Sequence, residues 1–225
     1  MKNWVETNIA VDNALNSSIM KKLIDTPQNE GTQMYVEGVV GVWSFKAYEV
    51  FDKEWIDSSS EELGVEINNA LIFNRKAKYQ HAGAHIDINS DDFGALHPVN
   101  YSLNWVLEPD TNPMVWYKPW WDAEDLEQCK LAVRGKIPFP GLEGEVVGDG
   151  SLKYQETPCK LLERDSEHCI RHDVATVCRT NIPHNVDMIS DKERWCFTAR
   201  NLGDYNHPVW SKVYKHLSLL YPTNC

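Results

Sequence analysis

The chain has 225 residues, is 42% hydrophobic, and carries a formal net charge of −11 at pH 7. That length suits one sizeable hydrophobic core, so we expect a single domain over residues 1–225. The negative charge argues against general nucleic-acid binding, because phosphate is held by Lys and Arg.

Composition also indicates where the protein works. No apolar run approaches the ~20 residues of a membrane span, and the N-terminal residues lack the apolar core of a secretory signal. The six cysteines show no Cys-x-x-Cys spacing. We therefore expect no membrane association and a reduced, cytoplasmic protein, with Cys178 and Cys196 as free buried thiols.

The N-terminal third predicts a helix followed by strands. Apolar residues at helical spacing predict an amphipathic helix over 12–25, with Asp12 as its N-cap. Apolar runs at 38–45 and 70–73 predict strands. These elements place an N-terminal helix and strand within 1–69, ahead of a core at about 70–200.

Two more strands are predicted at 101–107 and 114–117, and an insert at 118–143 follows them. Residues 120–133 have helical composition, and the insert reads as a lid over a site. Its acids Asp122, Glu124 and Asp125 would favour a substrate with an amine or guanidinium, although solvated surface acids are the commoner explanation.

The last third predicts a hairpin, two strands and a helix. The hairpin lies at 145–154 around Gly-Asp-Gly, and a β-branched segment at 173–178 predicts a strand. Residues 194–200 alternate between apolar and polar, which is typical of a strand with a half-polar inner face. A C-terminal helix is expected within 205–222.

Four residues carry the candidate chemistry: His85, Asp87, His184 and Arg194. In a strand, residues i and i+2 point to the same face, so His85 and Asp87 can converge on one ion. His184 follows Pro183 at the end of a predicted strand, and Arg194 comes ten residues later. Two imidazoles and one carboxylate form the facial triad that holds Fe(II) and leaves positions open.

This pattern resembles that of the 2-oxoglutarate/Fe(II)-dependent oxygenases: His-x-Asp, a long variable stretch, a distal His, and a basic residue shortly after it. The resemblance covers about residues 70–200. It implies a mainly β protein with flanking helices, built on a double-stranded β-helix, the jelly-roll or cupin-like barrel. It also implies a hydroxylase of a small-molecule or peptide substrate that decarboxylates 2-oxoglutarate to succinate and CO2.

The resemblance assigns roles to residues. His85, Asp87 and His184 would hold Fe(II), 2-oxoglutarate would chelate it, and O2 would take the last position. Arg194 would pair with the far carboxylate of 2-oxoglutarate, a charge-assisted contact, with Arg200 as the second candidate.

Further co-substrate contacts are expected from Thr198, Asn74 and Asn104. Many members have Arg-x-Ser where this chain has Arg194-Trp195-Cys196, and Thr198 is the residue that could replace the missing hydroxyl. Asn74, eleven residues before His85, lies where some members place an asparagine or tyrosine near the co-substrate.

Other interpretations stay open. His85 and Asp87 could be a surface turn, and the barrel could bind a metal or ligand without 2-oxoglutarate or without catalysis. His168 and His172 could form part of a zinc site, but no cysteine pair completes it. Halogenases of this superfamily have Gly or Ala in place of the aspartate, so Asp87 favours hydroxylation. The sequence determines neither the substrate nor the oligomeric state.

Overall fold

The computed structural model describes residues 1–16, 19, 32–33, 40–75, 77, 83–90, 93–137, 157–158, 161–203 and 208–224. Within these ranges, no helix has the length and apolar character needed to cross a membrane.

A seven-stranded antiparallel sheet forms one wall of the molecule. Its strand order is β1-β12-β8-β14-β4-β3-β2. The bounds are β1 (Trp4–Ala10), β2 (Thr32–Gln33), β3 (Val40–Lys46), β4 (Asn69–Arg75), β8 (Tyr101–Val106), β12 (Val174–Arg179) and β14 (Arg194–Arg200). Strand β14 pairs along its full length with β4 and along part of it with β8.

A smaller sheet forms the facing wall, with the order β11-β9-β13. Its strands are β9 (Met114–Tyr117), β11 (Arg164–His168) and β13 (His184–Val186). An isolated bridge between His85 and His184 brings the segment after β5 (Gly83–Ala84) to the free edge of β13. Strand β5 pairs with β10 (Thr157–Pro158), and β6 (Ile88–Ser90) pairs with β7 (Leu96–Pro98).

The path of the chain between these walls defines the fold. From β4 onward it visits the large sheet, the small sheet at His85, the large sheet at β8, and the small sheet at β9 and β11. It then returns to the large sheet at β12, crosses to β13 and ends at β14. This alternation between two facing antiparallel sheets is a double-stranded β-helix, so the predicted mainly β fold class is confirmed.

One face of the large sheet packs against the helices, and the other faces the small sheet. On β14, the apolar residues Phe197 and Ala199 pack into the core beneath the helices, together with Leu103 and Trp105 of β8. The alternate positions point between the two sheets, where Cys196 joins Val106 in a second cluster. Because side chains alternate along a strand, the inner face receives Arg194, Cys196, Thr198 and Arg200.

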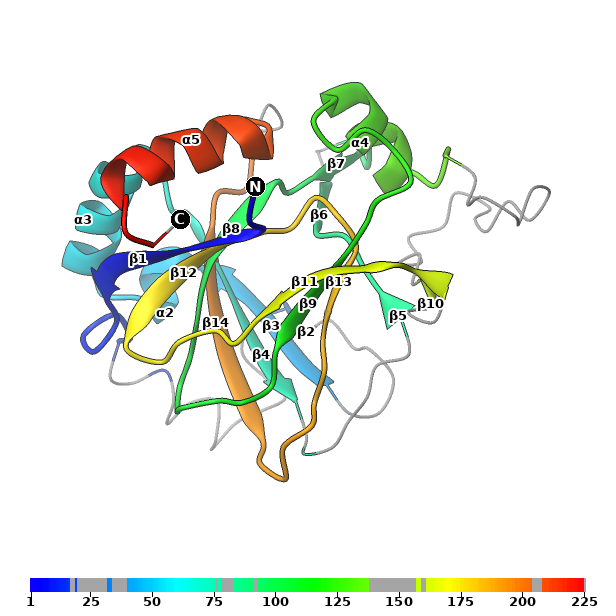
Figure 1. Cartoon of the computed structure of the whole chain (residues 1–225). Coiled ribbons are helices and arrows are strands. Elements are labelled where there is room, and N and C mark those ends of the chain that lie inside the picture. The colour runs from blue at the N-terminus through cyan, green and yellow to red at the C-terminus, as the bar shows by residue number, and fades with distance from the viewer. Residues whose placement is uncertain are drawn as a thin grey trace.

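Helices cover the outer face of the large sheet. They are α2 (Ala47–Val50), α3 (Lys53–Leu63) and α5 (Trp210–Leu220), and Figure 1 shows α3 and α5 together on one side of the molecule. Asp52 caps α3, and Gly64 ends it with a φ of 66°, which a glycine adopts without strain. Helix α4 (Leu126–Val133) lies beside β7, away from α3 and α5.

Most predicted strands agree with the structure, and one predicted helix does not. The strand predicted at 194–200 is found with those bounds, and the strands near 101, 114 and 173 are displaced by one residue at most. The helix predicted over 12–25 is wrong for 12–16: these residues form a turn, and Leu15 pairs with Phe51. Pairing with the segment after α2 satisfies this backbone, so it does not need helical hydrogen bonds. The hairpin predicted at 145–154 lies outside the described residues.

Candidate metal centre

His85 and His184 lie directly opposite each other across the edge of the small sheet. Each backbone N–H donates to the carbonyl of the other, at 3.0 Å and 2.9 Å. Opposed residues in an antiparallel pair project their side chains to the same face. The two imidazole rings accordingly lie 4.4 Å apart, centroid to centroid. A local backbone pairing thus joins two residues that are almost a hundred positions apart.

Asp87 completes the cluster from the same segment as His85. Its N–H donates to the carbonyl of Thr180 at 3.0 Å, and its own carbonyl accepts from Val99. Its carboxylate Oδ1 is 3.6 Å from Nε2 of His85 and 3.5 Å from Nε2 of His184. One ligand atom from each of the three residues lies within 4.8 Å of the others, so together they could hold a metal ion.

The surroundings of His184 and Asp87 suit metal ligands. Nδ1 of His184 lies 2.9 Å from the carbonyl oxygen of Ile182, so Nδ1 donates to it, and Nε2, the nitrogen that faces Asp87, is the one that a metal could take. Burial opposes ionisation of Asp87, but the hydrogen bond from His184 and the charges of the two histidines and Arg200 outweigh it. The pKa of Asp87 falls to about 2, so the carboxylate is ionised and available to a cation at neutral pH.

Arg200 is the last residue of β14 and lies beside the cluster. Its Nη1 is 4.0 Å from Oδ2 of Asp87, and its Nε donates to Oδ1 of Asn69 at 3.1 Å. These contacts associate Arg200 with the candidate metal ligand Asp87. They suit a residue that orients a carboxylate, with its ligand oxygen Oδ1 turned toward the histidines.

A cavity of about 50 Å³ lies between the two sheets at the cluster. This volume holds a few water-sized ligands. The inner-face residues Thr198 and Asn104 line it, as do all three members of the cluster. Thr198 donates its hydroxyl to Oδ1 of Asn104 at 2.5 Å, and Asn104 donates to Ser102.

Arg194 lines the same cavity and is already ion-paired. Its Nε donates to Oδ2 of Asp110 at 2.5 Å, and both side chains are buried. Arg194 also borders a larger cavity of about 620 Å³ that Asp110 lines with the loops around residues 107–111 and 190–193. Arg75, which the β14–β4 register sets opposite Arg194, lines the cavity of about 50 Å³ as well.

Of the predicted site residues, Asn74 and Arg200 do not line this cavity; Arg200 reaches the cluster through Asp87, whereas Asn74 points away. On β4, Phe73 and Arg75 line the cavity, so strand alternation turns Asn74 to the opposite face, where it donates to Glu193. Asp110 and Arg75 were not among the site residues predicted from the sequence. A turn was the only signal around Asp110, and Arg75 ends an apolar run with nothing in the sequence to mark it as inward-facing.

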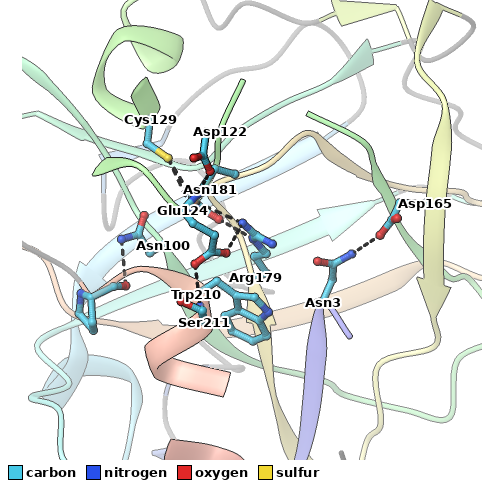
Figure 2. A network of polar contacts seen from close by, with 12 residues as sticks. Asn3, Asn100, Asp122, Glu124, Cys129, Asp165, Arg179, Asn181, Trp210 and Ser211 are labelled. Carbon is cyan, nitrogen blue, oxygen red and sulfur yellow. Dashed lines mark hydrogen bonds and ion pairs between the residues drawn. The ribbon is translucent and has the colours of Figure 1, made fainter. Parts of the chain in front are cut away.

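The insert is fixed to the barrel along its described part, residues 118–137. Figure 2 shows Glu124 between Arg179 at the end of β12, whose Nη2 is 2.9 Å from Oε1, and Ser211 at the start of α5, whose N–H donates to Oε2 at 2.9 Å. Asn181 donates to the carbonyl of Ala123 at 3.0 Å. The residues Trp121, Ala123 and Cys129 are buried in the second core cluster. These contacts show that the described part of the insert packs against the barrel, and they do not support the predicted lid.

The acids of the insert have structural partners too. Asp125 is the N-cap of α4, and Asp122 accepts a hydrogen bond from the N–H of Glu124. We therefore do not assign them to substrate recognition.

We expect the Arg179–Glu124 pair to contribute to stability. Arg179→Met should lower the free energy of unfolding by about 2 kcal/mol, less than for a fully buried pair because Glu124 is partly exposed. Urea unfolding followed by fluorescence measures this change. The exposed pair of Lys118 and Glu163 gives a control, since Lys118→Met should cost less than about 1 kcal/mol. Equal losses in the two variants would contradict the structural role.

Asp87 should give stability a pH dependence of known sign. Its folded-state pKa of about 2 lies below the ordinary 3.8, so its ionisation stabilises the fold above about pH 4 and is lost as the pH falls toward 2. The shift corresponds to about 2 kcal/mol. In the metal-free protein, the difference in unfolding free energy between wild type and Asp87→Asn should change by that amount across this window. A pH-independent difference would refute the prediction.

Comparisons with known proteins identify similar folds only. No protein-family model matches the chain, and no curated protein sequence matches it either. One similar structure is a serine-to-alanine mutant of the Bacillus subtilis oxalate decarboxylase OxdC, with a TM-score of 0.34 and 10% identity. The match covers 86% of this chain and 36% of the decarboxylase chain, so this chain spans about a third of that protein.

A second similar structure is the non-heme alpha-ketoglutarate-dependent carbocyclase SnoK from nogalamycin biosynthesis. Its TM-score is 0.43 and its identity 10%, over 92% of this chain and 85% of the carbocyclase. Both TM-scores are low, and the assignment of the fold therefore rests on the strand order and register.

Proposed function

We propose that the protein is an Fe(II)- and 2-oxoglutarate-dependent dioxygenase that hydroxylates a small molecule or a peptide. The observation that carries the proposal is the convergence of His85, Asp87 and His184 at one end of the barrel cavity. Two imidazoles and one carboxylate on neighbouring backbone segments leave open positions on the metal, the arrangement of non-heme Fe(II) oxygenases.

Each inner-face residue has a role in this proposal. The triad binds the metal, and Arg200 orients Asp87 through the 4.0 Å contact. Arg194, which borders both the small cavity and the larger one of about 620 Å³, receives the distal carboxylate of 2-oxoglutarate. The Thr198–Asn104 pair presents polar atoms along the wall of the small cavity. The iron supplies the oxidation chemistry when it is bound, and the barrel supplies orientation and exclusion of water.

Calorimetry and product analysis test this function. Protein loaded with Mn(II), a redox-silent substitute, should bind 2-oxoglutarate. Protein loaded with Fe(II) and supplied with 2-oxoglutarate should release succinate and CO2 slowly in air, even without the substrate to be hydroxylated. Bound metal with neither binding nor succinate release would reject the proposal.

A second candidate is a cupin-type barrel that binds a metal or ligand without 2-oxoglutarate. The ion pair between Arg194 and Asp110 favours it, because the expected anchor of the co-substrate already has a carboxylate partner. The same calorimetry separates the two candidates.

A further inference from the structure

Asp110 is ion-paired with Arg194, the residue that is proposed to bind the distal carboxylate of 2-oxoglutarate. It lies in the loop between β8 and β9, and its carboxylate accepts from Nε of Arg194 at 2.5 Å. The side chains are 4% exposed for Arg194 and 8% for Asp110. A pair so shielded from water is screened weakly, and its charges are felt strongly by any ion that enters the cavity.

The position of Asp110 is fixed by a second residue. Its Oδ1 accepts from the side-chain amide of Asn112 at 2.5 Å and from the backbone N–H of Asn112 at 3.0 Å. The amide oxygen of Asn112 in turn accepts from the N–H groups of Ile189 and Ser190, both at 2.8 Å. The β8–β9 loop and the β13–β14 loop are thereby joined, and the carboxylate is held in place before any ligand arrives.

This arrangement has an electrostatic consequence for a dicarboxylic ligand. A distal carboxylate at Arg194 is attracted by the guanidinium and repelled by Asp110, so the net attraction is much smaller than for a lone arginine. Asp110 contacts Nε, and the guanidinium has further N–H donors for a second anion. Binding of the distal carboxylate is therefore weakened and not abolished.

We propose that Asp110 is a specificity-determining residue that lowers the preference of the barrel for 2-oxo acids with a distal carboxylate. It acts as an internal counter-charge to Arg194 and raises the 2-oxoglutarate concentration that the protein needs. This role of Asp110 rests on the proposed function, and it adds a residue that determines which 2-oxo acid the protein prefers as its co-substrate.

Asp110→Asn is the direct test, because asparagine keeps an oxygen that can accept from Arg194 and removes the charge. Calorimetry on the Mn(II)-loaded protein would compare 2-oxoglutarate with 2-oxovalerate, which has the same carbon chain and no distal carboxylate. The variant should bind 2-oxoglutarate at least tenfold more tightly and 2-oxovalerate with an affinity within about twofold of wild type. Asp110→Glu, which keeps the charge, should keep the weaker binding of 2-oxoglutarate.

Two controls keep the result specific. Glu108→Gln removes an exposed charge from the same loop and should change neither affinity. Mn(II) stoichiometry reports whether each variant is folded, and Asp110→Ser replaces the asparagine variant if that one fails to fold.

The outcomes separate the inference from the proposed function. Unchanged or weaker 2-oxoglutarate binding by Asp110→Asn, or an equal gain for both acids, overturns the role of Asp110 alone. If no form of the metal-loaded protein binds either acid, the proposed function fails and the inference fails with it.

Discussion

His184→Ala is expected to abolish stoichiometric binding of Fe(II), or of Mn(II) as its substitute. His184 is 4% exposed, and its Nε2 lies 3.5 Å from the carboxylate of Asp87. With the imidazole removed, His85 and Asp87 are the remaining members of the cluster, and two ligands hold a divalent ion far less firmly than three. Dialysis of the Mn(II)-loaded protein followed by elemental analysis measures the metal content. His85→Ala should give the same result.

A histidine away from the cavity provides the matched control. His172 is exposed, and His172→Ala should keep one metal ion per chain. Full metal content in both triad variants would show that the three residues are not the ligands. Loss of metal from all three variants would point to a general effect of removing histidine.

The second large effect is expected at Arg194. Arg194→Ala should raise the dissociation constant of 2-oxoglutarate at least tenfold, because it leaves the distal carboxylate without a partner in a largely dry site. Truncating one partner of such a pair costs on the order of 2–5 kcal/mol. The variant also leaves Asp110 buried without its cation, so the remaining negative charge opposes the ligand further. Calorimetry on Mn(II)-loaded protein provides the measurement.

Arg200→Ala separates the two arginines. Because Arg200 contacts Asp87, its loss should weaken Mn(II) binding and affect 2-oxoglutarate less at equal metal occupancy. The exposed Arg171, paired with Asp173 on the surface, supplies a control that should change neither constant. A larger 2-oxoglutarate effect from Arg200→Ala than from Arg194→Ala would move the proposed anchor to Arg200.

Thr198 lines the cavity as predicted and Asn74 does not, and the patterns of their two strands explain the difference. Strand β14 alternates between apolar and polar residues, so its inner face was predictable, and Thr198 lines the cavity. Strand β4 is buried on both faces, and an all-apolar run such as Leu71-Ile72-Phe73 does not show which parity points inward. For that reason the orientation of Asn74 could not be predicted from β4 alone.

The sequence by itself determined the strands, their alternation and the set of residues able to form a metal site. The spacing of His85 and Asp87, the ten residues from His184 to Arg194, and the half-polar β14 are local properties, and local periodicity survives in any fold that contains the strand. Only the tertiary structure decided which distant residues meet. The His85–His184 bridge, the pairing of Arg194 with Asp110 and the anchoring of Glu124 by Arg179 join positions 55 to 99 residues apart. Such contacts depend on the order of the strands and on their register. A register shift of one residue would turn every side chain of a strand to the other face of the sheet, and no short segment of the chain encodes the register.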